Sequence, residues 1–191
     1  MSRQRIIKKK KTLFTKEKVD NNFCIIDVSF SHPFIKINTG VIHDCFNECF
    51  SNTNLDRLNG KGQLLLLYDD KTVDETCKID KKSVLCLFTL SQTTKQFNEI
   101  WNVCTPIDKR GHKYLRKLMD FYLKKYNTID TKLYVNMNPL SDDISVSNPS
   151  DLIEIYKNLS FKISLADAES NLVTLIRKKN RSKPRRSKKM L

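Results

Sequence analysis

The stretch WNVCTPIDKRGHKYLRKLM, from Trp101 to Met119, most constrains the fold, because it changes from strand to helix around a single glycine. Residues 96–104 have the aromatic and β-branched content of a strand, and Pro106 ends it. The helix predicted from about Gly111 to Tyr126 has an apolar stripe at helical spacing, made by Leu115, Leu118, Met119, Tyr122 and Tyr126. Residues 132–138 predict the next strand, and a strand–helix–strand unit favours a parallel pair in one sheet.

Elements on both sides of this unit predict one mixed sheet. The strands predicted from aromatic and β-branched runs are residues 22–30, 63–68, 83–92, 161–166 and 171–179. Helices are predicted at 41–50 and 151–159, the latter capped by Ser150 or Asp151, and a short helix around Leu55 and Leu58 is a further option. The three consecutive strands before the turn are most simply antiparallel. We therefore expect an α/β (α+β) fold: a mixed, mostly antiparallel sheet of 6–7 strands flanked by about four helices.

The net charge of +14 is concentrated at the two ends of the chain. Residues 1–18 contain eight Lys or Arg and one Glu, and residues 177–191 contain nine Lys or Arg and no acidic residue. Residues 19–176 therefore carry a net charge of −2. We expect a basic tail (1–18), one domain (19–176) and a second basic tail (177–191). Such tails solubilise a protein, bind nucleic acid, an acidic protein or anionic lipid, or act as a nuclear address.

The cysteines and the N-terminus indicate a cytoplasmic or nuclear protein. Residues 1–18 lack the apolar core of a signal peptide, and no apolar run is long enough to cross a bilayer. The six cysteines form no CxxC pair and have no histidines at zinc spacing. They are therefore expected to be reduced, mostly buried thiols, and no metal site is predicted. Cys45 and Cys49 lie four residues apart on a predicted helix, where core packing explains them better than a metal does.

Two segments carry a resemblance to a known family. RGHKYL begins at Arg110, between a predicted strand and a predicted helix, and DLIEIYKNLSF contains Tyr156. With the order of elements, they resemble the GNAT superfamily of acyl-CoA-dependent N-acyltransferases over about residues 22–176. That family has a turn Arg/Gln-x-x-Gly-x-Gly/Ala after its fourth strand, and a later tyrosine helix that ends in Gly-Phe. Here Lys113 and Leu115 occupy the usual Gly/Ala positions of the turn, and Ser160 replaces the later glycine.

The resemblance implies that acetyl-CoA binds at this turn as a co-substrate. A helix N-terminus has unpaired backbone N–H groups and a partial positive charge, so it suits the pyrophosphate of coenzyme A. Lys113 places a bulky stem where the family has bare backbone, although its ammonium could contact a phosphate from outside. The residues implied in binding are Val103, Cys104, Thr105, Arg110, Gly111, His112, Lys113, Tyr114, Leu115 and Asn148.

The resemblance also implies two catalytic side chains. Tyr156 would act as the general acid that protonates the departing thiolate; otherwise it packs on the apolar side of its helix. Glu99 would take the amine proton through water; otherwise it faces solvent. A backbone N–H near Val103 or Cys104 would polarise the thioester carbonyl. Trp101 packs on the sheet or lines an acceptor groove.

The resemblance thus predicts an N-acetyltransferase that moves an acetyl group from acetyl-CoA to a primary amine by direct attack. The acceptor stays open among a protein N-terminus, a lysine side chain, a polyamine and another small amine, because acceptor specificity lies in the loops 51–62 and 139–149. The alternative is a catalytically inactive module of the same fold whose basic tails bind nucleic acid or acidic partners. Lys113, Leu115 and Ser160 motivate this alternative.

Overall fold

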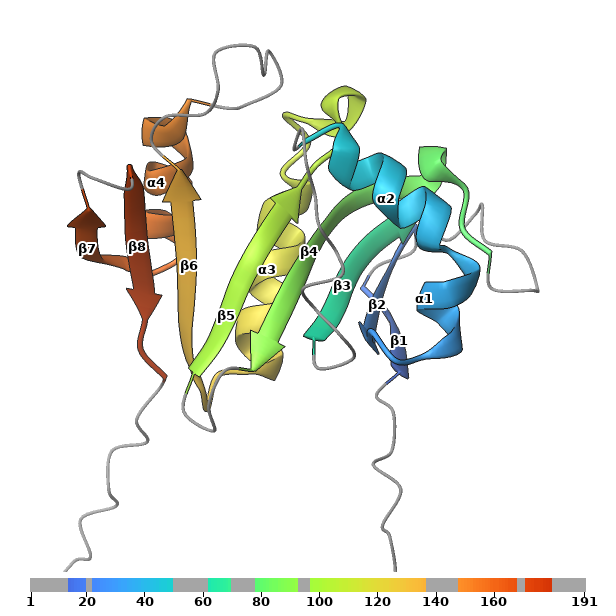
Figure 1. Ribbon diagram of the computed structural model, residues 1–191, viewed down its shortest axis with the longest axis horizontal. Coiled ribbons are helices and arrows are strands. Elements are labelled where there is room, and N and C mark those ends of the chain that lie inside the picture. The colour runs from blue at the N-terminus through green and yellow to red at the C-terminus, as the bar shows by residue number, and fades with distance from the viewer. Residues whose placement is uncertain are drawn as a thin grey trace, which may run out of the picture.

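The computed structural model shows one eight-stranded sheet with helices on both faces (Figure 1). It describes residues 14–19, 22–49, 62–69, 78–92, 97–136, 148–167 and 171–179. The short helix expected around Leu55 and Leu58, most of the two acceptor loops and most of both basic tails lie outside these residues. The predicted mixed, mostly antiparallel sheet is confirmed, with one strand more than the sequence predicts.

The order of strands across the sheet is β1-β2-β3-β4-β5-β6-β8-β7. The strands are β1 (Phe14–Lys18), β2 (Phe23–Ser29), β3 (Gly62–Asp69), β4 (Val84–Gln92), β5 (Phe97–Cys104), β6 (Asp130–Asn136), β7 (Lys162–Asp167) and β8 (Leu172–Arg177). Every neighbouring pair is antiparallel except β5 and β6, which are parallel. The antiparallel run before the turn and the parallel pair on either side of the central helix both agree with the prediction.

Among the described residues, four α-helices cover the two faces of the sheet. They are α1 (Pro33–Ile37), α2 (Thr39–Asn47), α3 (Tyr114–Lys125) and α4 (Pro149–Asn158). In Figure 1, α1 and α2 lie in front of strands β2–β4, whereas α3 and α4 lie behind the sheet. In the part of the chain that the structure describes, no helix combines the length and apolar character needed to cross a membrane.

Alternation along β3 divides the core into two halves. Leu65 and Leu67 pack in the half that contains α3, and Leu64 and Leu66 pack in the half that contains α1 and α2. All four side chains are fully buried, because helices cover both faces of the sheet at this strand. A strand that is buried on both faces needs a continuous apolar run, which explains the LLLL of this segment.

The apolar stripe predicted for α3 faces the sheet and anchors the helix at one end. Leu118, Met119 and Tyr122 are fully buried. The Tyr122 hydroxyl accepts a hydrogen bond from Asn98 Nδ2 at 3.1 Å and lies 2.9 Å from the Thr131 hydroxyl, so it links α3 to the first residues of β5 and β6. Because α3 runs back along the sheet, its N-terminus lies near the opposite ends of these two strands.

Three features differ from the prediction, and the first is α1, a helix that the sequence does not predict. β1 lies within residues 1–18, where the charge predicts a tail, and Lys125 of α3 holds it by contacts with Thr15 (2.8 Å) and Glu17 (3.3 Å). The N-cap of α4 is Asn148, not Ser150 or Asp151, and its side chain accepts a hydrogen bond from the Ser150 N–H at 3.1 Å. Pro149 at the first helical position suits this start, because the N–H that proline lacks has no helical partner there.

Candidate active site

The parallel strands β5 and β6 separate toward their carboxyl ends (Figure 1). The place where their pairing ends is the centre of the candidate site, and we call it the β5–β6 opening. Their pairing runs from Phe97–Asp130 to Ile100–Leu133 and stops there. A β-bulge bends β5 at the next residues, because Trp101 and Asn102 both face Thr89 of β4. The Asn102 N–H donates to the Thr89 hydroxyl at 3.2 Å. Beyond Ile100, the β6-facing backbone of β5 therefore has no partner strand in the described sheet.

The N-terminus of α3 lies at this opening and is not capped by a side chain. A short 3₁₀-helix (Ile107–Lys109) follows β5, and the N-cap residue of α3 is Lys113. The first hydrogen bond of the helix runs from the Lys117 N–H to the Lys113 carbonyl at 3.1 Å. The first turn contains no acidic residue. Free N–H groups at a helix start attract an anion, so the turn has the properties that a pyrophosphate requires.

Lys113 adopts the backbone conformation that glycine adopts without strain. Its φ is 61° and its ψ is 21°, in the left-handed region, and Gly111 has a φ of 80°. A left-handed residue other than glycine costs roughly 1–2 kcal/mol. The turn therefore keeps the backbone geometry for which a glycine is suited, and the lysine side chain remains exposed at the mouth of the opening. Leu115 is half-buried against the α3 half of the core, as its place in the stripe predicts.

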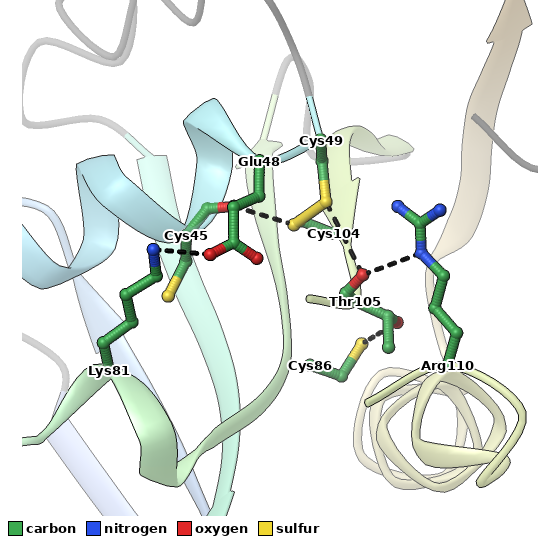
Figure 2. The surroundings of a disulfide bond; sticks show 8 residues. All are labelled: Cys45, Glu48, Cys49, Lys81, Cys86, Cys104, Thr105 and Arg110. Atoms are coloured by element: carbon green, nitrogen blue, oxygen red, sulfur yellow. Dashed lines mark hydrogen bonds and ion pairs between the residues drawn. A yellow bond between two sulfur atoms is a disulfide. The ribbon is translucent and has the colours of Figure 1, made fainter. Parts of the chain in front are cut away.

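Arg110 braces the turn from inside. Its Nε donates to the Thr105 carbonyl at 3.2 Å (Figure 2), which links the turn to the residue after β5. Lys109 pairs with Asp108 at 3.0 Å. The His112 ring is exposed and stacks on Tyr114, with 5.5 Å between ring centroids. The basic side chains of the turn thus both shape it and give it positive charge.

A disulfide between Cys49 and Cys104 corrects the expectation that all cysteines are reduced thiols (Figure 2). Cys49 follows the C-cap of α2, and Cys104 is the last residue of β5. Their Cα atoms are 5.7 Å apart, a distance that allows the bond. Cys49 Sγ lies 3.7 Å from the Thr105 carbonyl oxygen, and Cys104 Sγ lies 3.0 Å from the Cys45 carbonyl oxygen. Neither bonded sulfur carries a proton, so these are close sulfur–oxygen contacts.

The other described cysteines are buried thiols, as predicted; they are Cys24, Cys45 and Cys86. Burial raises the pKa of both Cys45 and Cys86 to about 12, so both are protonated and unreactive at neutral pH. Cys77 lies outside the described residues.

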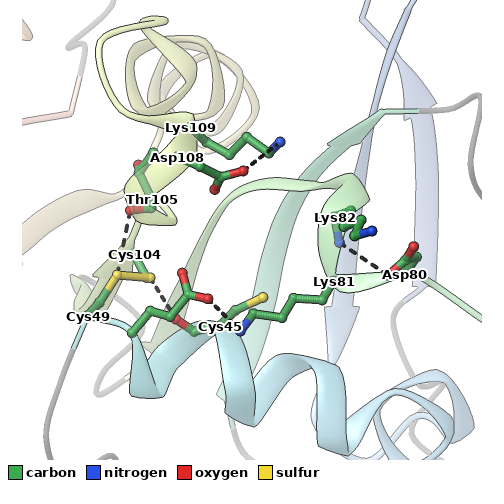
Figure 3. Close-up of polar contacts among 10 residues, drawn as sticks. Cys45, Cys49, Asp80, Lys81, Lys82, Cys104, Thr105, Asp108 and Lys109 are labelled. Atoms are coloured by element: carbon green, nitrogen blue, oxygen red, sulfur yellow. Dashed lines mark hydrogen bonds and ion pairs between the residues drawn. A yellow bond between two sulfur atoms is a disulfide. The ribbon is translucent and has the colours of Figure 1, made fainter.

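An ion pair and a helix cap hold the α2 side of the disulfide in place (Figure 3). Lys81 contacts Glu48, the C-cap of α2, at 2.5 Å, and this hydrogen-bonded contact raises the pKa of Lys81. Lys81 begins a 3₁₀-helix (Lys81–Ser83) before β4, and Asp80 caps that helix through the Lys82 N–H at 3.2 Å. The end of α2 is therefore fixed to both β4 and β5.

Tyr156 is buried behind the opening. Its side chain is 3% exposed and packs edge-on against Phe161, with 6.0 Å between ring centroids. Burial raises its pKa above the ordinary value, and negative charge on Cys86 would raise it further. Tyr156 of α4 and Cys86 of β4 belong to the same half of the core, the one that contains α3. The phenol is protonated at neutral pH.

Glu99, Trp101 and Tyr134 form a polar–aromatic cluster on the sheet face opposite α3. Ile100 packs in the α3 half of the core, so its neighbours Glu99 and Trp101 point to the other face. The Tyr134 hydroxyl donates to Glu99 Oε1 at 3.3 Å, and its ring lies 5.3 Å from that of Trp101. Trp101 Nε1 donates to the Ser91 hydroxyl at 2.9 Å, which fixes an indole that is 49% exposed. Glu99 is only 8% exposed.

The structure thus brings most of the predicted site residues together around one opening. Val103, Cys104 and Thr105 lie along its β5 edge, and residues 110–115 lie at its mouth. Asn148 lies at the start of α4 and uses its side-chain oxygen as a helix cap. Sequence reasoning missed Tyr134, whose only signal was its place in a predicted strand. In the described residues, no group of three or more His, Cys, Asp or Glu side chains is placed to hold a metal ion.

Solved structures with the same fold include several acetyltransferases. One is a GNAT family acetyltransferase from Elizabethkingia anophelis with acetyl-CoA bound, which is 12% identical with a TM-score of 0.55 and covers 83% of this chain and 99% of its own. An acyl-CoA N-acyltransferase from Pseudomonas aeruginosa is 12% identical with a TM-score of 0.56, over 81% of this chain and 99% of its own. An aminoglycoside 6'-N-acetyltransferase complexed with coenzyme A is 12% identical with a TM-score of 0.52, over 79% and 95%.

At the level of sequence, no family model and no curated protein matches the chain. The structural matches nevertheless extend over about four fifths of it and over nearly the whole of each solved protein. Identities of 12% to solved structures establish architecture alone. By the course of its strands and helices, this chain has the fold of the GNAT N-acetyltransferases.

Proposed function

We propose that the chain is an N-acetyltransferase that holds acetyl-CoA at the opening between β5 and β6 and transfers its acetyl group to a primary amine. The observation that carries this proposal is the end of strand pairing at Ile100 and Leu133, beside the uncapped N-terminus of α3. The open edge of β5 offers backbone donors to the acyl arm, and α3 offers donors to the pyrophosphate. Proteins of the same fold have been solved with acetyl-CoA or coenzyme A bound, which supports the assignment.

The turn from Arg110 to Leu115 is the proposed pyrophosphate site. The unpaired N–H groups of the first helical turn supply hydrogen bonds, and the helix dipole adds partial positive charge. Arg110 holds the turn against the end of β5 through the Thr105 carbonyl. A fixed turn costs less entropy when the ligand binds than a mobile turn would.

Three groups of this chain perform the proposed transfer. A backbone N–H near Val103 or Cys104 polarises the thioester carbonyl while the neutral amine attacks the carbonyl carbon. Glu99 accepts the amine proton through a water molecule. As the carbon–sulfur bond breaks, Tyr156 gives its phenolic proton to the departing thiolate and regains a proton from solvent when the products leave. Burial raises the pKa of Tyr156, so this proton is present at neutral pH.

The cluster of Glu99, Trp101 and Tyr134 is the proposed acceptor face. In the described part of the chain, no Lys or Arg forms an ion pair with Glu99, so its charge is available to an amine. The exposed Trp101 ring and the neighbouring Tyr134 ring can hold an ammonium group by cation–π contact before it is deprotonated. The acceptor is a primary amine of a protein N-terminus, a lysine side chain, a polyamine or another small molecule. A cytoplasmic or nuclear location stays a prediction.

Calorimetric titration of the full chain with acetyl-CoA tests the proposal. We expect saturable binding that weakens severalfold in Gly111→Ala, because a side chain at a φ of 80° strains the turn. Gly40→Ala is the matched control, since neither glycine has an atom within 4 Å of an added Cβ and Gly40 lies in α2, on the far face of the sheet. Absence of binding at high micromolar acetyl-CoA would overturn the assignment.

An inactive module of the same fold is the second candidate. The left-handed lysine at position 113 and the complete burial of Tyr156 favour it, because both restrict access to the opening. Mass spectrometry of mixed amines after incubation with acetyl-CoA separates the two functions. Binding of acetyl-CoA without transfer to any amine would favour the inactive module.

A further inference from the structure

The strand β7 forms one edge of the sheet and exposes apolar side chains there (Figure 1). The strand order ends at β7, so among the described residues no strand pairs with its outer side. All six of its side chains are exposed, and Ile163 and Leu165 are 47% and 61% exposed. An edge strand with an apolar centre presents unpaired backbone groups together with apolar surface, which favours pairing with another chain.

The opposite edge of the sheet, β1, differs from β7 in its charge. Three of the five residues of β1 are charged, and charge along an edge strand opposes pairing with another chain. Lys125 of α3 also contacts Thr15 and Glu17 of β1. In β7 only the first and last residues, Lys162 and Asp167, are charged, and the four between them are uncharged. Of the two edges, β7 is therefore the one suited to pairing.

A register shift in the pairing of β7 with β8 brings the two charges of β7 onto one face of the sheet. Lys162 lies opposite Ile176, and Asp167 lies opposite Leu172. Ile176 and Leu172 are four residues apart in β8, so they point to the same face, as do the β7 residues opposite them. Lys162 and Asp167 are five residues apart, so β7 has one residue more than β8 over this stretch. Without that extra residue, the two charges would point to opposite faces.

This arrangement makes β7 complementary to a second copy of itself. Leu165 lies opposite Thr174, which is midway in β8 between the residues opposite Lys162 and Asp167. If two β7 strands pair antiparallel with Leu165 at the centre, Lys162 of each copy therefore lies opposite Asp167 of the other. The two Leu165 side chains meet at the two-fold axis. Opposite charges that face each other across an antiparallel pair stabilise it, whereas like charges destabilise it.

We propose that two copies of this chain form a dimer by antiparallel pairing of their β7 strands around a two-fold axis at Leu165. Such a contact uses the same edge in both copies, so it closes at two chains and joins the two sheets into one. Tyr134 of β6 lies opposite Thr174, in the same row as Leu165 and two strands away from the axis. The dimer therefore leaves the cluster of Glu99, Trp101 and Tyr134 uncovered in both copies. This inference goes beyond acetyl transfer and does not depend on it.

Analytical ultracentrifugation of the full chain over a range of protein concentrations tests the proposal. The wild-type chain is expected to sediment as a dimer at high micromolar concentration. Lys162→Asp is expected to raise the dissociation constant of the dimer about tenfold, because two carboxylates then face each other at both ends of the pair. Combining Lys162→Asp with Asp167→Lys puts opposite charges back across the pair and is expected to restore the dimer. Lys18→Asp is the matched control, since Lys18 is also an exposed lysine of an edge strand, but of β1.

Leu165→Lys is a second variant that does not depend on the charges at the ends of β7. It places two ammonium groups at the two-fold axis and is expected to give a monomer. Because Leu165 is largely exposed, the fold of the single chain should tolerate this change, and an unchanged Tm would confirm that it does.

Three results would overturn the proposal. The first is a wild-type chain that stays monomeric at high micromolar concentration. The second is a dimer that Lys18→Asp weakens as much as Lys162→Asp does, which would assign the contact to β1. The third is a folded double variant that remains monomeric, which would show that Lys162 and Asp167 do not face each other across the dimer.

Discussion

The Tyr134 hydroxyl of β6 donates a hydrogen bond to Glu99 Oε1 of β5, next to the last residue pair before the two strands separate. Glu99 lies one residue before Ile100 and Tyr134 one residue after Leu133, the final paired residues. The contact therefore orients a carboxylate at the edge of the opening without neutralising it. Burial and the nearby Glu99 charge raise the pKa of Tyr134.

Removing the Tyr134 hydroxyl should impair transfer more than binding. Tyr134→Phe is expected to lower kcat about tenfold and to leave acetyl-CoA affinity unchanged, because a hydrogen bond to a charged group contributes on the order of 1.5 kcal/mol. Glu99→Gln is expected to lower kcat about a hundredfold or more, as for loss of a general base. Tyr68→Phe, which removes a buried hydroxyl from β3, is the control. Equal kcat values in Glu99→Gln and wild type would refute the role of Glu99.

Lys113→Gly should stabilise the protein and open the proposed pyrophosphate site. Relief of the left-handed conformation is expected to raise the free energy of unfolding by about 1 kcal/mol, measured by urea denaturation. We also expect tighter binding of acetyl-CoA, because the lysine stem no longer covers the helix N-terminus. Lys113→Gln separates charge from bulk: it keeps the stem and removes the ammonium. Weaker binding by both variants would show that the ammonium holds the phosphate.

Most of the helices and strands could be predicted from the sequence, but the register of the strands could not. The stripe of α3 and the parallel pair around it follow from side-chain spacing, which local physics determines. The opening itself depends on a bulge at Trp101 and Asn102, and nothing in the residue types marks that position. The contact between Tyr134 and Glu99 requires the register of β5 with β6, which only tertiary packing fixes.

Two further features escaped prediction for different reasons. Cys49 and Cys104 are separated by 55 positions, and cysteine counting cannot say which residues a fold brings together. The strand Phe14–Lys18 was not predicted, because three of its five residues are charged and have low strand propensity. Backbone pairing with β2 stabilises it instead. The N-cap role of Asn148 could have been predicted, since asparagine followed by proline commonly starts a helix.

The Cys49–Cys104 disulfide is expected to stabilise the oxidised protein. Closing a loop of this length contributes roughly 4 kcal/mol in the chain-entropy description, and 2–4 kcal/mol is typical. A reductant should therefore lower the Tm of the wild-type chain and have no effect on Cys49→Ser. Alkylation of the unfolded chain should detect two more thiols after reduction than before. An unchanged thiol count would show that the purified protein is reduced.

Tyr156→Phe tests the general acid directly. If the phenol protonates the thiolate, the variant should lose kcat by roughly 10²-fold while the KM for acetyl-CoA stays near its wild-type value. A tyrosine that only packs against Phe161 would instead tolerate phenylalanine with little change in kcat. Thiol leaving groups of lower pKa need less protonation, so acyl thioesters of more acidic thiols should restore activity in the variant. Failure of such rescue would contradict the assignment even if kcat falls.

Stability should fall at alkaline pH because the fold keeps buried phenols and thiols protonated. Burial raises the pKa of Tyr68 from 10.0 to about 12 and the pKa of Cys45 and Cys86 from 9.0 to about 12. The unfolded chain loses these protons first, so the stabilisation is complete below pH 9 and is lost as pH rises toward 12. Each such group lowers the free energy of unfolding by about 1.4 kcal/mol per pH unit in that range. Urea denaturation between pH 8 and pH 11 measures the slope, and Tyr68→Phe should flatten it above pH 10. A free energy of unfolding that stays constant over this range would show that these groups are solvated in the folded protein.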